Sequence, residues 1–410
     1  MQKLLNHKYR NVGQLYFALL CIVCMFLGML IARALTGIAM VCFCVNGILF
    51  YTSINKLKAL FKNYFYWGGA ILFLIVFVSG FWGGFNAAWQ YSGYVKLPFV
   101  VLPIGFFALQ HISKKQYQYL ILSICFLLFL GTCYSLIAFW LNATEILNNY
   151  NKAKVIPVPF DGNHIYFSFT IVALVIFLLN IIINAWHTTL IYISAFFIFW
   201  FTIYLHILAA KTGVVLLYFV FFIHIIYFVF TSKYKLWFIG LLVFTMCLPI
   251  IFYNISPTFK TRIAYIKYDY FVSKSTNLNT QGLSDGSRWR SILAGVHIVN
   301  NNKILGVGAG QIIINTNNWY NINTPNILLY ERMQPSSQFL WYLCCAGVFG
   351  LLAFSFYTAV FFIMPKQLVG WYCLAIIIIV FLSYEIGHEG QYGVLVIALL
   401  PWLWKASIKK

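Results

Sequence analysis

The chain has 410 residues, of which 62% are hydrophobic and only 8% are charged. A soluble domain cannot bury so much apolar surface, so the composition excludes a water-soluble globular protein and predicts an all-α polytopic membrane protein. The formal net charge is +20. The basic residues gather in alternate loops between apolar runs, which favours a membrane partner and no nucleic acid.

A helix of roughly 17–25 apolar residues can cross the hydrocarbon core of a bilayer. About twelve segments of the chain reach or approach that length, and we expect about twelve transmembrane helices. In chain order they cover residues 13–33, 34–52, 64–84, 97–112, 117–140, 164–185, 188–209, 212–230, 235–253, 337–364, 367–386 and 390–404. The fourth and the twelfth of these segments are the shortest.

Charges in the loops predict how these helices are oriented. With a cytoplasmic N-terminus, the inner short loops hold most of the basic residues found in short loops, among them Lys56, Lys62, Lys114 and Lys233. This distribution obeys the positive-inside rule. The 7 acidic residues all fall on the opposite, outer side. We therefore expect both termini to lie in the cytoplasm.

Two outer loops divide the chain. The prolines and polar residues of loop 141–163 argue against a simple helix there, and loop 254–335 is far longer than an ordinary connection. We expect this long loop to carry function and to fold onto the outer mouth of the helix bundle. The predicted parts are 1–163 (helices 1–5 and the first loop), 164–253 (helices 6–9), 254–335 (the long outer loop) and 336–410 (helices 10–12).

The segment SDGSRWRSILAGVHIVNNNKILGVGAGQ, residues 284–311, is the distinctive part of the long loop. Its apolar residues from Trp289 to Val299 have the spacing of an amphipathic helix. Ser284 or Asp285 can cap the start of this helix. The sequence therefore predicts a capped helix on the outer side.

Arg288 would then lie in the first turn of the helix, where free backbone N–H groups favour an anion. Its guanidinium can donate two parallel hydrogen bonds to a phosphate or pyrophosphate. Arg288 and Arg290 could equally be solvated loop charges, or Arg288 could pair with Asp285. Both interpretations are open from the pattern alone.

The glycine run GVGAG contains Gly306, Gly308 and Gly310. A nucleotide-binding glycine run needs a preceding strand and a following helix in a βαβ unit, and here the glycines follow a helix outside the membrane. We interpret the run as a tight turn that packs the loop against the bundle.

Ionisable residues at the outer ends of predicted spans are further candidates. Lys211 could hold a lipid phosphate or extend to the membrane interface. His164 could transfer protons near neutral pH or anchor its helix at the interface. His388 lies between Glu385 and Glu389 in the sequence YEIGHEGQYG. No Asp-x-Asp pair occurs in the chain, so we expect no metal ion and no cofactor.

The order of these motifs resembles the signature region of the O-antigen ligase and polymerase family. The resemblance is carried by SRWRSILAGVHIVNNNKILGVGAGQ and PSSQFLWYLCCAGVFGLLAF, with LAAKTG, NHIYFS and EGQYGVLVIALL beside them. It implies a GT-C-like membrane glycosyltransferase in surface polysaccharide biosynthesis. The implied donor is a glycan on undecaprenyl pyrophosphate, and the acceptor is a glycan or a lipid core. The implied reaction takes place on the outer face of the bacterial cytoplasmic membrane.

The resemblance also implies roles in binding the donor. Arg288 matches the family's loop arginine, which is thought to hold the donor pyrophosphate. Lys211 falls where the family usually has an arginine, so the charge is kept and the bidentate fork is lost. Arg290 is a further candidate for the same pyrophosphate.

The general base departs from the family pattern. Ser336 falls where many ligases have a histidine that activates the acceptor hydroxyl, which favours a polymerase over a ligase. His388, His164, Glu389 or water could take the proton instead. Of these we expect His388 first, because carboxylates flank it.

A transporter or flippase for an anionic or lipid-linked solute is the alternative from another class of protein. Transporters often contain two related halves and charged residues at mid-membrane depth. The sequence has no clear internal repeat, and its charges gather at the outer edge. Both observations favour the enzyme.

Overall fold

The computed structural model describes residues 2–49, 58, 60–110, 112–150, 155–275, 281–363 and 369–408. Within these ranges all regular secondary structure is helical. The helices, in chain order, are α1 (Gln2–Ile31), α2 (Arg33–Leu49), α4 (Tyr64–Val78), α5 (Gly80–Gly83), α6 (Ala87–Lys96), α7 (Pro98–Gly105), η1 (Phe106–Leu109), α8 (Lys114–Leu141), α9 (Ala143–Tyr150), α10 (His164–Ile183), α11 (Thr188–Leu208), α12 (Lys211–Thr231), α13 (Lys235–Ile255), α14 (Pro257–Ser275), α15 (Ser284–Asn301), η2 (Ala309–Gln311), α16 (Ile312–Asn323), η3 (Leu329–Glu331), α17 (Gln338–Ile363), α18 (Val369–Tyr384) and α19 (Gln391–Ile408).

Nine helical segments of the described ranges are long and apolar enough to cross a membrane. They are Val12–Ile31, Tyr64–Gly83, Ala87–Leu109, Lys114–Leu141, His164–Ile183, Thr188–Leu208, Lys211–Thr231, Lys235–Ile255 and Gln338–Ile363. The shorter apolar helices α2 and α18 coincide with two further predicted spans, and α19 covers the last one. The structure thus confirms a helical multi-pass membrane protein, while the count of twelve spans and the GT-C-like bundle stay predictions.

The helices of the bundle differ in how deeply they are buried. α10 contacts α8, α11, α12, α18 and α19, and its residues 167–178 are all buried. α13 has a single buried residue, Thr245, so its apolar side chains face outward, as expected of a helix in contact with lipid. Both helices are themselves apolar in sequence. Composition therefore does not distinguish the central helix α10 from the peripheral helix α13, and only the packing does.

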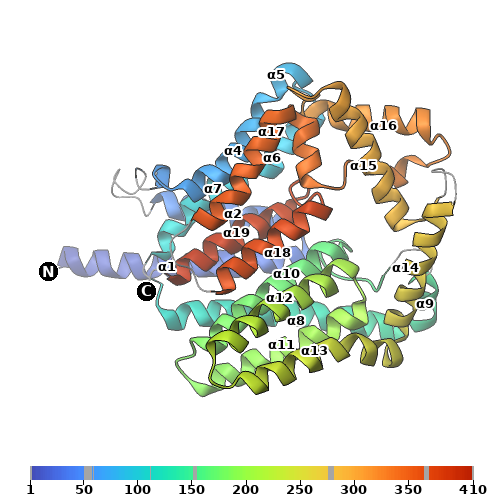
Figure 1. Ribbon diagram of the computed structural model, residues 1–410. Coiled ribbons are helices and arrows are strands. Elements are labelled where there is room, and N and C mark those ends of the chain that lie inside the picture. The colour runs from blue at the N-terminus through green and yellow to red at the C-terminus, as the bar shows by residue number, and fades with distance from the viewer. Residues whose placement is uncertain are drawn as a thin grey trace.

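The long loop folds at one end of the bundle. Figure 1 shows both chain termini at one end and α9, α14, α15 and α16 at the other. α14 contacts α9 and α11, α15 contacts α17, and η2 contacts α6. These contacts show that loop 254–335 packs against the bundle, while its outer location and its functional role stay predictions. In loop 141–163, α9 forms a short helix, and residues 155–163 are irregular, as their prolines predict.

The glycine run docks on a break in α17. The N–H groups of Val307 and Gly308 donate to the carbonyls of Cys344 and Cys345, over 2.8 and 2.9 Å. α17 leaves helical geometry at Gly347, whose φ is +56°. The interpretation of the run as a turn that packs against the bundle is confirmed.

Candidate functional site

A pocket of about 330 Å³ lies between the bundle and the long loop. Its walls come from the starts of α10 and α12, from α14, from the first turn of α15, from residues 330–333 and from the end of α18. His164, Lys211 and Arg288 all line this pocket. They come from three distant parts of the sequence, and the sequence pattern predicted each of them as a candidate site residue.

Arg262 on α14 is a fourth basic residue in the lining of the pocket. No sequence pattern distinguishes it from the other basic residues of loop 254–335. A helical wheel for residues 257–275 could have placed it on one face of α14, but could not have shown that this face meets the pocket. Burial lowers the pKa of Arg262 below its ordinary value, and neighbouring tyrosines and aspartates only partly offset that effect.

Two basic residues of the pocket are paired with carboxylates. Lys211 Nζ lies 2.7 Å from Asp285 Oδ2, and Arg288 Nη2 lies 2.5 Å from Glu385 Oε1. Burial alone would lower the pKa of Arg288, but Glu385, together with Tyr384 and Asp285, outweighs burial, so the net pKa is raised. The alternative in which Arg288 pairs with Asp285 is wrong, because Lys211 takes that carboxylate.

Arg288 is also fixed by the end of α18. Its Nη1 donates to the carbonyl oxygen of Tyr384 over 3.2 Å, and its guanidinium carbon lies 4.3 Å from the centre of the Tyr384 ring. The arginine is therefore held in place by an ion pair, a hydrogen bond and a cation–π contact. It is not a freely solvated loop charge.

The start of α15 is capped by another helix. The carboxylate of Asp269 on α14 accepts the N–H groups of Asp285 and Gly286 over 2.8 and 3.3 Å, and the hydroxyl of Ser284 over 3.2 Å. Ser284 and Asp285 themselves make no side-chain cap. The predicted local cap is wrong, because a buried carboxylate from α14 reaches the helix start and satisfies its N–H groups. Those groups are thus already engaged, and an anion in the pocket must be bound by side chains.

Arg290 and Ser336 lie outside the lining of the pocket. Arg290 is buried, and its Nη2 donates to Ser287 Oγ over 2.9 Å. The hydroxyl oxygens of Ser336 and Ser291 lie 2.5 Å apart, and the Ser336 N–H donates to Ser291 Oγ over 3.2 Å. Ser336 thus joins the segment before α17 to α15, whereas the bond from Arg290 to Ser287 lies within α15.

His388 and Glu389 are also placed away from the pocket lining. His388 is fully buried, with ring-centre distances of 4.9 Å to Phe99, 5.7 Å to Phe354 and 5.7 Å to Tyr357. Its backbone N–H donates to the side chain of Gln338 over 2.9 Å. The Glu389 carboxylate pairs with Lys96. The carboxylate neighbours in the sequence therefore do not create an exposed acid–base group.

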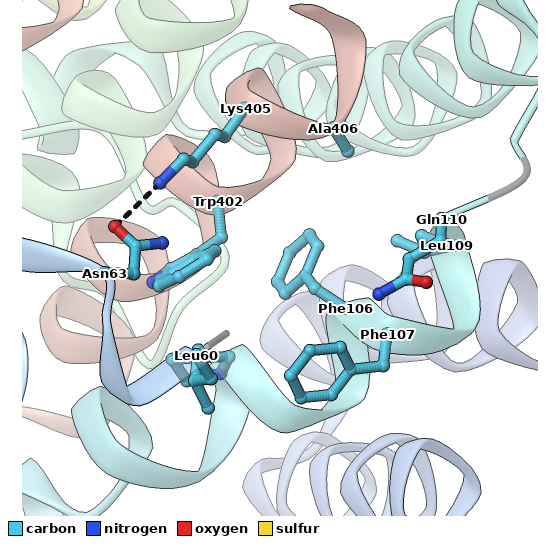
Figure 2. Close-up of a pocket in the computed structure, with 10 residues that line it drawn as sticks. Leu60, Asn63, Phe106, Phe107, Leu109, Gln110, Trp402, Lys405 and Ala406 are labelled. Atoms are coloured by element: carbon cyan, nitrogen blue, oxygen red, sulfur yellow. Dashed lines mark hydrogen bonds between the residues drawn. The ribbon is translucent and has the colours of Figure 1, made fainter. Parts of the chain in front are cut away.

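Figure 2 shows a second pocket, of about 160 Å³, at the C-terminal end of α19. Lys405 donates to Asn63 Oδ1 over 3.1 Å and lies 5.0 Å from the centre of the Trp402 ring. The other described lining residues are apolar or uncharged. No candidate residue from the sequence lines this pocket, so the pocket between bundle and loop is the stronger candidate.

Neither a protein-family model nor a curated protein sequence matches the chain. The resemblance to O-antigen ligases and polymerases therefore stays an expectation. In the described residues, no group of three or more His, Cys, Asp and Glu side chains is arranged to hold a metal ion.

Proposed function

We propose that the chain is a metal-independent membrane glycosyltransferase of the O-antigen ligase or polymerase type. It transfers an oligosaccharide from undecaprenyl pyrophosphate to a glycan or lipid acceptor, on the outer face of the bacterial cytoplasmic membrane. The supporting observation is that His164, Lys211 and Arg288 line one pocket although they are far apart in sequence. A pocket that combines cations with a histidine suits a phosphate leaving group and a proton acceptor.

The reaction breaks the bond between the anomeric carbon and the pyrophosphate oxygen, and the acceptor hydroxyl oxygen forms the new bond to that carbon. Lys211 and Arg288 stabilise the departing pyrophosphate by exchanging their carboxylate partners, Asp285 and Glu385, for phosphate oxygens. The released pyrophosphate keeps the electron pair of the broken bond, and the acceptor's proton passes to a base in the pocket.

His164 takes the role of general base in this proposal. Sequence reasoning placed His388 first, but His388 is enclosed by aromatic rings and does not line the pocket. A general base must lie within hydrogen-bond reach of the proton it removes. His164 is half-buried in the lining, next to where the cations would hold the donor.

The test is Arg288→Ala in the purified chain, assayed for transfer from an undecaprenyl-pyrophosphate-linked oligosaccharide. We expect transfer per folded molecule to be abolished. Arg288→Ala leaves the Glu385 carboxylate buried without its cation, so the double variant Arg288→Ala/Glu385→Gln, which removes that charge, is measured beside it and should also lack transfer. Lys303→Ala is the matched control, because Lys303 is an exposed cation of the same loop outside this pocket. Near-normal transfer by Arg288→Ala would contradict the role given to Arg288, and the absence of transfer by the wild-type chain would contradict the proposal.

The surface-glycan profile of a deletion strain separates the two reaction types. Loss of long chains, with single repeat units still attached to the lipid core, indicates a polymerase. Long chains that accumulate on the undecaprenyl carrier indicate a ligase. Ser336 at the usual histidine position favours the polymerase.

The broken helix α17 and the buried ion pair between Lys96 and Glu389 favour a second candidate, a transporter or flippase. Discontinuous helices and buried charges are common in transporters. In transporters such a break commonly lines the solute site. In this chain the glycine turn donates hydrogen bonds to the carbonyls at the break in α17, which supports the enzyme. Translocation of a lipid-linked glycan across sealed vesicles, without any transfer to an acceptor, would establish the transporter instead.

A further inference from the structure

Arg262 is buried in the wall of the candidate pocket and lacks a carboxylate partner among the described residues. Its exposed fraction is 6%. Its Nε and Nη1 atoms are buried and make no hydrogen bond within the described part of the chain. The guanidinium carbon lies 5.3 Å from the centre of the Tyr265 ring, which offers a cation–π contact in place of a hydrogen bond.

This state is energetically costly for an arginine. A guanidinium stays protonated in proteins, so its charge is kept when it is buried. A buried charge without a hydrogen-bonded partner loses hydration that nothing replaces. Burial accordingly lowers the pKa of Arg262. A bound anion would supply the missing acceptors.

The other cations of the pocket are already neutralised. Lys211 is paired with Asp285, and Arg288 is paired with Glu385. The N–H groups at the start of α15 are taken by Asp269. Of these groups, only the guanidinium of Arg262 can bind an anion without first breaking an ion pair or a helix cap.

We propose that Arg262 is the primary contact for a phosphate-type oxyanion in this pocket, and that Lys211 and Arg288 join it by exchange from their carboxylates. The inference deepens the proposed function, since the donor pyrophosphate carries this chemistry, and a phospholipid headgroup offers the same chemistry. Planar guanidinium groups bind phosphate oxygens through two parallel hydrogen bonds.

The experiment measures binding to the full-length chain in detergent by calorimetry, with inorganic pyrophosphate and dioctanoyl phosphatidylglycerol as separate probes. We expect Arg262→Gln to weaken binding by about tenfold or more, as expected when a charged hydrogen-bond partner is lost. Lys260→Gln is the matched control, because Lys260 is an exposed cation of the same helix outside the pocket. It should bind the probe like the wild type.

Each outcome decides the inference. Binding of either probe that is lost in Arg262→Gln supports it, and the probe that binds identifies the carrier pyrophosphate or the lipid headgroup as the source. Failure of both probes to bind the wild type, or equal affinity in Arg262→Gln, overturns it. If Arg262→Gln does not fold, Arg262→Lys replaces it, because lysine keeps the charge but cannot donate two parallel hydrogen bonds. Unchanged affinity in Arg262→Lys overturns the inference.

The outcome is also separable from the proposed enzyme function. Binding of pyrophosphate requires no transfer, so it can be measured on a chain that is not a glycosyltransferase. Loss of binding in Arg262→Gln, together with no transfer by the wild-type chain, would reject the enzyme proposal and retain the oxyanion site. Full binding in Arg262→Gln, together with loss of transfer in Arg288→Ala, would reject the oxyanion site at Arg262 and retain the enzyme proposal.

Discussion

Lys96 Nζ lies 2.5 Å from Glu389 Oε1, and the exposed fractions of the two side chains are 0% and 7%. Ser92 donates a hydrogen bond to the second carboxylate oxygen over 3.0 Å. Lys96 also lies 4.2 Å from the centre of the Trp341 ring. The pair joins α6 to the connection between α18 and α19, and that same connection begins with Glu385, the partner of Arg288. A buried ion pair in the bundle thus anchors the segment that holds a pocket residue.

Replacing Lys96 with methionine should destabilise the protein strongly. The change leaves the Glu389 carboxylate buried without its cation, and breaking a buried pair on one side typically costs about 3–5 kcal/mol. Thermal unfolding in detergent measures the effect. The double variant Lys96→Met/Glu389→Leu should recover most of the loss, because no uncompensated charge is left. Wild-type stability in Lys96→Met alone would show that the pair does not hold the fold.

Asp269→Ala should loosen the start of α15. The substitution removes the acceptor of the Asp285 and Gly286 N–H groups, and loss of a helix cap typically costs about 1 kcal/mol. Hydrogen exchange should become faster at the first turn of α15 and stay unchanged in α16. Asp269→Asn should have a smaller effect, since its amide oxygen can still accept one bond. Equal exchange in wild type and Asp269→Ala would rule out this cap.

His164→Gln and His388→Gln should differ in which property they change. Removing a general base typically lowers the rate by about 100-fold or more, so His164→Gln should reduce transfer with normal abundance of the folded protein. His388→Gln disturbs an aromatic enclosure, and it should lower the melting temperature with little effect on transfer per folded molecule. The reverse pattern would return the base to His388.

Gly306→Ala should destabilise the contact between the long loop and α17. Gly306 has a φ of +63°, and an added Cβ would lie 2.4 Å from the carbonyl oxygen of Cys344. Strain of this kind costs on the order of 1–3 kcal/mol. Gly37→Ala is the matched control, because nothing lies within 4 Å of its added Cβ. The melting temperatures of both variants test the difference, and equal values would contradict the close approach.

Apolar patterning alone predicts much of the fold. Long runs of Phe, Leu, Ile and Val must be helical in lipid, since every backbone N–H and C=O needs an internal partner there. The turn at Gly306 and Gly308 was also predictable. The glycine run follows a predicted helix instead of a strand, which argues against a nucleotide site and favours a turn with close backbone packing. The same local reasoning selected His164, Lys211 and Arg288 as candidates, and the structure brings these three into one pocket.

Tertiary structure alone decided how the charges of the pocket are satisfied. Proximity in the sequence suggested Asp285 as a partner for Arg288 and Glu389 as a partner for His388. In the structure Asp285 pairs with Lys211, and Glu389 pairs with Lys96. Each of these pairs joins residues that are far apart in the chain. Their formation depends on how the helices pack, and a one-dimensional pattern does not contain that packing. For the same physical reason, only the folded chain reveals Arg262 as a buried cation in the wall of the pocket.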